Sequence, residues 1–269
     1  MQGRLLPAVG GRLQAFPGPL WKTELAMARQ AGIDGLELIY EGAEQKDNPL
    51  AIHDGEPLLQ EITSHYGVVA ISVCADRLLE SPVVASDLAD RAILANELCD
   101  ALPRWSAGGI ERVVLPFVDA NRIRGPNGQD AVAAWMGSVL PAAEAAGIEL
   151  HLEADLDPNS MRALLNRLDH PLIRVNYDTG NSASLGYDTY DELEAYGSRI
   201  GSIHIKDRVR NGGSVPLGEG DADIELALRG LHDLGFEGDL VLQVVRAPDG
   251  REVNWARRNA AYVRELCGG

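Results

Sequence analysis

Cysteine is scarce in this 269-residue chain, which contains Cys74, Cys99 and Cys267 and no others. Their number is odd and their spacing matches no metal-binding pair, which argues against a disulfide framework and against a cysteine-rich zinc site. Unpaired cysteines of this kind fit a reducing compartment, so we expect a cytoplasmic protein.

Positive charge is also in short supply. The chain has 24 lysines and arginines against 40 aspartates and glutamates, a formal net charge of −16 and a pI near 4.7. Such a chain repels phosphate backbones and anionic membrane surfaces, so we expect neither nucleic acid nor membrane as a partner. A local cationic pocket could still hold one small anion. No apolar window reaches transmembrane length, and the N-terminus lacks a segment typical of a signal peptide.

Short runs rich in Val, Ile and Leu alternate with longer helical patterns. Strands are predicted at 2–6, 35–40, 68–75, 111–117, 148–154, 173–178, 200–206 and 239–245. Several runs are apolar on both alternations, as expected of parallel strands covered on both faces. Helices are predicted at 20–31, 55–66, 86–102, 129–146, 158–168, 189–196, 224–234 and 252–266. Asp54, Ser86 and Asp223 are candidate caps, and Pro103 is expected to interfere with the third helix.

Eight strand–helix units without a composition shift or a low-complexity linker predict one closed (β/α)8 barrel, a single domain over residues 1–269. An open doubly wound sheet is the alternative. The sequence has no GxGxxG after its first strand, which favours the barrel.

Polar residues close four consecutive predicted strands, in LHLEAD, VNYDTGN, SIHIKDR and LVLQVV. Because the carboxyl ends of barrel strands meet at one mouth, Glu153, Asp178, His204 and Gln243 are expected at comparable heights there. Two carboxylates, an imidazole and an amide oxygen suit Mn²⁺ or Mg²⁺, and suit Zn²⁺ or Co²⁺ less well. Any one of these residues could be a loop anchor, but four together are hard to explain as core.

These motifs, together with VPLGEGDAD, resemble the xylose isomerase-like family of sugar and sugar-phosphate isomerases and epimerases. The resemblance covers residues 148–245 and is closest to the pentulose-phosphate 3-epimerase branch. It implies a divalent cation, commonly Mn²⁺, held by Glu, Asp, His and Glu from the four strand ends. Matched by motif, Glu153, Asp178 and His204 are the first three ligands, and the fourth position is Gln243 rather than Glu.

That substitution changes the expected chemistry. The resemblance implies two glutamates that exchange protons on opposite faces of an enediolate, and a glutamine cannot accept a proton at neutral pH. Glu153 remains as a base for aldose–ketose isomerisation or for elimination of water from a keto-sugar or keto-inositol. Alternatively, the protein is a degenerate barrel that binds sugar without turnover. A related endonuclease would need a larger His, Asp and Glu cluster and a basic face, neither of which is present.

Several further residues are candidates for substrate binding. Asn181 lies three positions after Asp178, and Asp155 follows Glu153 toward the mouth, where it could supply the missing base. Lys206 and Arg210 belong to a local cationic cluster that could bind a phosphate.

Other polar residues have two open interpretations. His151 is a structural histidine or a partner of a ligand, and Asp76 is a turn or cap residue or a contact to a hydroxyl. Glu37 either faces the sugar or pairs with Arg4. The sequence thus predicts a metal-dependent isomerase or epimerase of a ketose, an aldose or a sugar phosphate. Because barrels of the family often pair, a homodimer is also expected.

Overall fold

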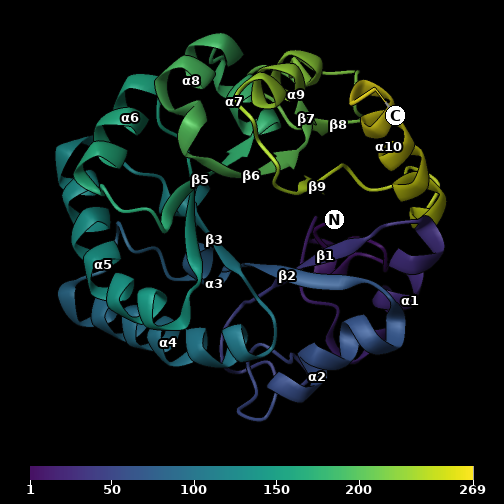
Figure 1. Ribbon diagram of the computed structural model, residues 1–269, viewed down its shortest axis with the longest axis horizontal. Helices are drawn as coiled ribbons and strands as arrows, with labels where there is room; N and C mark the ends of the chain where they lie inside the picture. The colour runs from purple at the N-terminus through teal and green to yellow at the C-terminus, as the bar shows by residue number, and fades with distance from the viewer. Residues whose placement is uncertain (269) are drawn as a thin grey trace.

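The structure, a computed structural model, describes residues 1–268, apart from the side chain of Ile71. Its centre is a parallel seven-stranded sheet in the order β1-β2-β3-β4-β5-β6-β9. Those strands are β1 (Gly35–Ile39), β2 (Val69–Cys74), β3 (Arg112–Phe117), β4 (Glu149–Ala154), β5 (Ile173–Asp178), β6 (Ile200–Ile205) and β9 (Leu240–Leu242). The sheet curls into a ring that the helices surround (Figure 1). This is the expected (β/α)8 barrel.

The N-terminal segment closes the ring, although it forms no full strand. Gln2 makes an isolated parallel bridge with Glu37 of β1, and its backbone N–H donates to the carbonyl of Leu242 of β9 at 3.1 Å. The first predicted strand, residues 2–6, is therefore reduced to one bridge. Gly3 and Arg4 have left-handed backbones, with φ of 48° and 73°, which end the extended conformation directly after Gln2.

The outer layer consists mainly of helices. They are α1 (Trp21–Ala31), α2 (Glu56–Glu61), α3 (Arg77–Glu80), α4 (Leu88–Ala107), α5 (Gly125–Ala146), α6 (Pro158–Arg167), α7 (Thr179–Leu185), α8 (Thr189–Tyr196), α9 (Ile224–Asp233) and α10 (Glu252–Leu266). After β6, a small antiparallel pair, β7 (Asp207–Arg208) and β8 (Ser214–Val215), stands outside the ring. No helix in the described part of the chain is both long and apolar enough to cross a membrane.

Three helix ends differ from the sequence predictions. Asp87, not Ser86, caps α4 by accepting from the N–H groups of residues 89 and 90. Pro103 does not end that helix, which continues to Ala107. The apolar face includes Trp105 beyond the proline, fully buried, and this packing outweighs the one backbone hydrogen bond that a proline removes. The helix α2, which follows β1, begins at Glu56 without a side-chain cap, so Asp54 is not its cap.

A connected polar network runs through the middle of the barrel. The Nδ1 of His151 lies 2.7 Å from the Ser202 hydroxyl, which donates to Asn176 at 2.7 Å. Asn176 in turn donates to Glu153 at 3.1 Å. All four side chains are buried, and buried polar groups are stable when they are hydrogen-bonded to one another. His151 is thus a buried structural histidine, coupled to the mouth of the barrel through two side chains.

Candidate active site and metal centre

Three of the four predicted ligands converge at the carboxyl ends of the strands. Glu153 is near the end of β4, Asp178 ends β5 and His204 pairs in register with Asp178 from β6. The Nδ1 of His204 lies 3.3 Å from a Glu153 oxygen and 3.9 Å from an Asp178 oxygen. One ligand atom from each residue lies within 4.8 Å of the others, and all three residues are buried. The structure therefore brings together residues far apart in the chain as one donor set.

The spacing of these atoms fits a small divalent cation. Metal–ligand bonds of about 2.0–2.2 Å place neighbouring donor atoms about 3 Å apart. The 3.3 Å distance from the His204 Nδ1 to Glu153 is close to that value, and the 3.9 Å distance to Asp178 is longer. Burying two carboxylates beside one another is costly unless a positive charge compensates. Lys206, 3.3 Å from Asp178, supplies part of that charge, and a cation held by Glu153, Asp178 and His204 would add to it.

Glu37 orients the histidine of this donor set. The Nε2 of His204 lies 2.8 Å from a Glu37 oxygen, and both side chains are fully buried. This hydrogen bond leaves Nδ1 directed at Glu153 and Asp178, as required of a ligand. Burial by itself lowers the pKa of His204, but the charges and hydrogen bonds of Glu37 and Glu153 raise it to about 10, so a metal at Nδ1 would displace a proton. Glu37 therefore pairs with His204, not with Arg4.

We expect Glu37→Gln to weaken metal binding about 10–100-fold, because carboxylates that orient a ligating histidine have effects of this size. Isothermal titration with Mn²⁺ or Mg²⁺ measures the change. Glu144→Gln is a matched control, since Glu144 lies 3.1 Å from the Nε2 of His170, away from the donor set. Equal metal affinity in the two variants would contradict the orienting role of Glu37.

Glu153 is held by two amide side chains. Asn181 donates to one of its oxygens at 2.9 Å and Asn176 donates to the other at 3.1 Å. Asn181 is in α7, a helix that the sequence analysis does not predict. Asp178 caps this helix by accepting from the N–H of Asn181 at 2.8 Å. The same aspartate therefore starts α7 and points its second oxygen at the donor set.

Gln243 and Lys206 form a pair beside the donor set. The Lys206 ammonium donates to the Gln243 amide oxygen at 2.7 Å, to Asn181 at 3.2 Å and to Asp178 at 3.3 Å. The Gln243 amide nitrogen donates to Gln2 at 2.8 Å and lies 3.2 Å from the Nδ1 of His204. In this arrangement the amide oxygen is bound to Lys206, so three residues rather than four direct donor atoms at one point.

A cavity of about 520 Å³ opens at this end of the barrel, with Glu153, Asn181, Lys206 and Gln243 in its walls. Asp155 also lines it and forms an ion pair with Arg122 at 2.7 Å. Of the six predicted site residues other than Asp178 and His204, five therefore line the cavity, and Arg210 does not.

The cationic side chains after β6 do not all line the cavity. Arg208 lines the cavity and donates to Asn181 at 2.9 Å, whereas the exposed Arg210 packs against Gly186 and is not part of the cavity wall. β7 ends at Arg208 and the chain turns at Arg210 and Asn211, so Arg208 occupies the place in the cavity wall that was predicted for Arg210. Arg4, Gln14 and Asp76 also line the cavity. Arg4 was predicted only as a partner of Glu37, and Gln14 was not predicted because it lies between the predicted elements.

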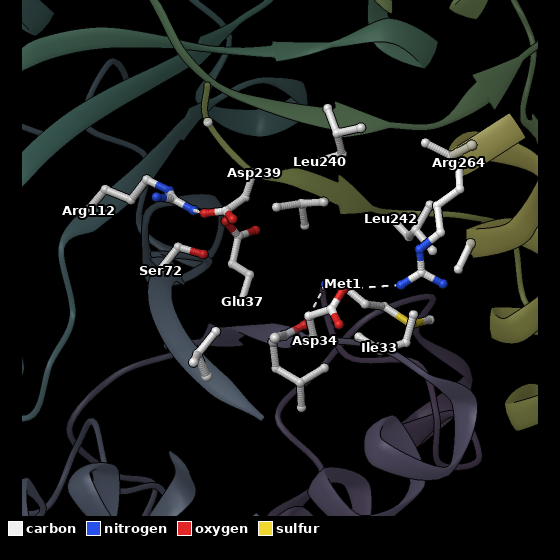
Figure 2. A pocket seen from close by; sticks show the side chains of 17 residues that line it. Met1, Ile33, Asp34, Glu37, Ser72, Arg112, Asp239, Leu240, Leu242 and Arg264 are labelled. Atoms are coloured by element: carbon white, nitrogen blue, oxygen red, sulfur yellow. Dashed lines mark hydrogen bonds and ion pairs between the residues drawn. The ribbon is translucent and has the colours of Figure 1, made fainter. Parts of the chain in front are cut away.

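A second cavity, of about 290 Å³, lies at the opposite end of the barrel (Figure 2). Glu37, Ser72 and the ion pair between Arg112 and Asp239 are in its wall. Among the described residues around the donor set, Glu37 alone also lines this second cavity. The candidate ligands and the residues that hold Glu153 belong to the mouth, so the mouth is the candidate active site.

Comparison with known proteins agrees with this geometry. A family model described as xylose isomerase-like TIM barrel matches residues 25–266. A 2-epi-5-epi-valiolone 7-phosphate 2-epimerase of Actinoplanes is 24% identical over 260 residues, which are 92% of this chain and 93% of that protein. An inosose dehydratase of Clostridium perfringens is 25% identical over 121 residues. That match takes in 38% of this chain and only 41% of the dehydratase.

Solved structures show the same fold. A xylose isomerase-like protein from Mycobacterium smegmatis in complex with magnesium has a TM-score of 0.73 at 17% identity, over 95% of this chain and 90% of that one. A D-allulose 3-epimerase from Methylomonas in complex with D-allulose has a TM-score of 0.71 at 18% identity, over 90% of each chain. At such identities the likeness establishes the barrel and not the reaction.

Proposed function

The chain belongs to the xylose isomerase-like TIM barrel family, and we propose that it is a divalent-metal-dependent isomerase or epimerase of a ketose, an aldose or a sugar phosphate. One observation supports this proposal above the others. A cavity of sugar size has in its wall a carboxylate, Glu153, that is buried, held at both oxygens and adjacent to two further metal-type ligands. The epimerases among its relatives and structural neighbours support the same class of reaction.

Glu153 is the base in this proposal. Its two amide partners, Asn176 and Asn181, fix the carboxylate in one orientation, which favours proton transfer at a defined carbon of the substrate. A metal bound by Glu153, Asp178 and His204 would polarise the substrate carbonyl and stabilise the negative charge of an enediolate. The donor set suits Mn²⁺ or Mg²⁺, and a magnesium-bound neighbour supports this choice.

Gln243 is a neutral neighbour of the site in this proposal. It cannot accept a proton, and its oxygen is already hydrogen-bonded to the Lys206 ammonium. Its amide therefore holds Lys206 in place and could present its oxygen to the metal only if Lys206 moved.

Lys206 and Arg208 are the cationic side chains nearest to Asn181 in the cavity, where they are placed to bind a substrate phosphate or hydroxyl. The pentulose-phosphate branch, the homodimer and the cytoplasmic location stay predictions.

Elimination of water is the second candidate. It requires one strong base and an acid, and it is compatible with a glutamine at position 243. The partial match to an inosose dehydratase supports it. Elimination differs from isomerisation in an observable way, since the product loses a molecule of water and the reaction does not reverse to the starting sugar.

Proton NMR in D₂O tests the proposal. The protein is loaded with Mg²⁺ or Mn²⁺ (the latter removed before spectra are recorded) and is given ketoses, aldoses and their 5- and 6-phosphates. We expect deuterium to enter at a carbon beside the carbonyl, and chelation with EDTA to abolish the exchange. Entry at C1 or C2 indicates isomerisation, and entry at C3 indicates epimerisation. Absence of exchange for all these sugars, with metal bound, would contradict the proposed function.

A further inference from the structure

Position 243 has no carboxylate, but the mouth cavity has other acidic groups in its wall. Besides Glu153, the cavity is lined by five carboxylates: Glu41, Asp76, Glu80, Asp119 and Asp155. Arg12 forms ion pairs with Glu41 and, at 3.9 Å, with Glu80, and Arg122 pairs with Asp155. Asp119 is exposed. Asp76 differs from all of them, since it is buried and none of the described cationic groups lies within ion-pairing distance.

Asp76 directs its side chain at the cavity instead of at its own helix. It directly precedes α3, but its carboxylate forms no capping hydrogen bond there. Both oxygens accept from uncharged donors, one from the Gln14 amide at 2.9 Å and one from the Cys74 thiol at 3.2 Å. A residue at the start of a helix commonly accepts from the first free N–H groups of that helix. The orientation of Asp76 therefore has another cause than helix capping.

A chain of hydrogen bonds connects Asp76 to Gln243. Arg4 donates to the backbone carbonyl of Gln243 at 2.6 Å and to the Gln14 side chain at 2.6 Å, and Gln14 donates to Asp76. Arg4 is buried and has a left-handed backbone, an arrangement that costs free energy and is typical of functional sites. Asp76 is thus tied to the strand end where the second carboxylate is missing, two strands away from Glu153 around the ring.

Its surroundings keep Asp76 ready to carry a proton. Burial raises its pKa to about 6, the hydrogen bonds from Gln14 and Cys74 lower it in part, and the charges of Glu153 and Glu41 raise it. Arg4 is the cation that faces it, through Gln14 and without an ion pair. The Cys74 thiol stays protonated, because burial raises its pKa well above the usual value. Both protonation states of Asp76 are therefore accessible near neutral pH.

We propose that Asp76 is the second proton-transfer group of this site and has the role of the carboxylate that is absent at position 243. The proposal rests on the proposed function. Glu153 removes the proton from the carbon beside the carbonyl, and the electrons of that C–H bond pass into the enediolate. Asp76, in its acid form, donates its proton to a carbon of the enediolate, and a new C–H bond forms at that carbon. The composition of the substrate is unchanged, and both carboxyl groups return to their starting states by proton exchange with water.

The test compares Asp76→Asn, Asp76→Glu and wild type. The probe is a sugar, from the ketoses, aldoses and phosphates above, into which the Mg²⁺-loaded wild type introduces deuterium in a Glu153-dependent manner. NMR follows two rates, deuterium entry into the remaining substrate and appearance of product. We expect Asp76→Asn to slow product formation at least about 100-fold while deuterium entry stays within about threefold of wild type. Asp76→Glu is expected to recover part of the product rate.

Asp47→Asn is the matched control, since Asp47 is an exposed aspartate of the loop after β1 and is not in the cavity wall. Circular dichroism and the increase in Tm on adding Mg²⁺ verify that each variant folds and binds metal. A product rate in Asp76→Asn within about threefold of wild type would overturn the role of Asp76. A parallel loss of both rates would also overturn it, because Asp76 would then support the step of Glu153. Both outcomes leave the proposed function intact, whereas a wild type that exchanges no deuterium with any of these sugars overturns both.

Discussion

Glu153→Gln is expected to lower metal-dependent deuterium exchange by about 10²–10⁴-fold, the usual effect of losing a general base. The glutamine keeps the shape of the side chain and one oxygen for the metal, but it cannot accept a proton. The Glu153 oxygen that faces His204 accepts from Asn176 and the other accepts from Asn181, so the glutamine can keep the first of these two hydrogen bonds. The rate of deuterium entry, measured by proton NMR at saturating Mg²⁺, gives the effect directly.

Asp155→Asn tests which of the two carboxylates at the end of β4, Glu153 or Asp155, is the base. Asp155 lines the same cavity but is paired with Arg122, so we expect its substitution to change deuterium entry much less than Glu153→Gln does. The reverse order of effects would identify Asp155 as the base and Glu153 as a ligand alone. Metal titration of both variants shows whether a lost rate reflects lost metal.

Asp76→Asn is expected to make the folded protein more stable at pH 7.5 and to have little effect near pH 4. The pKa of Asp76 rises from 3.8 to about 6 on folding, mainly because of burial. The folded state therefore binds this proton more tightly than the unfolded state, and the free energy of unfolding falls as pH rises from about 4 to about 6. A shift of this size corresponds to about 3 kcal/mol, which is the upper limit of the gain, because asparagine can accept only one of the two hydrogen bonds that the carboxylate accepts. Urea unfolding at the two pH values measures the difference.

Asp157→Asn provides a control of opposite sign. Asp157 caps α6, and its hydrogen bonds with Ser160 lower its pKa, so its charged form stabilises the folded state above pH 4. Its substitution should therefore destabilise the protein at pH 7.5. If the difference in the free energy of unfolding between Asp76→Asn and wild type were the same at both pH values, the pKa of Asp76 would be ordinary. If Asp76→Asn were more stable and formed less product, the site would show the usual trade-off between stability and activity.

Much of the barrel is predictable from local patterns. All seven strands of the sheet, β1 to β6 and β9, lie within the predicted runs, because strands covered on both faces are rich in Val, Ile and Leu even where they carry single polar residues. Glycine stops such as Gly32 and Gly147 are also local, since a left-handed residue ends each of these helices. The first predicted strand and the continuation of α4 through Pro103 are exceptions. Pairing with distant strands determines the first, and packing against distant helices determines the second.

The three metal-type ligands follow from the sequence for the same reason. Once the strands are known, the carboxyl ends of a barrel bring Glu153, Asp178 and His204 to one mouth regardless of the loops between them. Residue type then limits the chemistry, since a base is available at Glu153 and none is available at Gln243. These conclusions need only strand ends and the properties of side chains.

Only the tertiary structure decides which partner each of these side chains has. That Glu37 orients His204, that Lys206 binds the Gln243 oxygen, and that Asp76 faces the cavity all depend on contacts between segments far apart in the chain. Such contacts depend on side-chain rotamers and loop paths, which have no periodic signature in the sequence. Local patterns therefore determined the fold and the chemical class of the site, and long-range packing determined how its protons and charges are arranged.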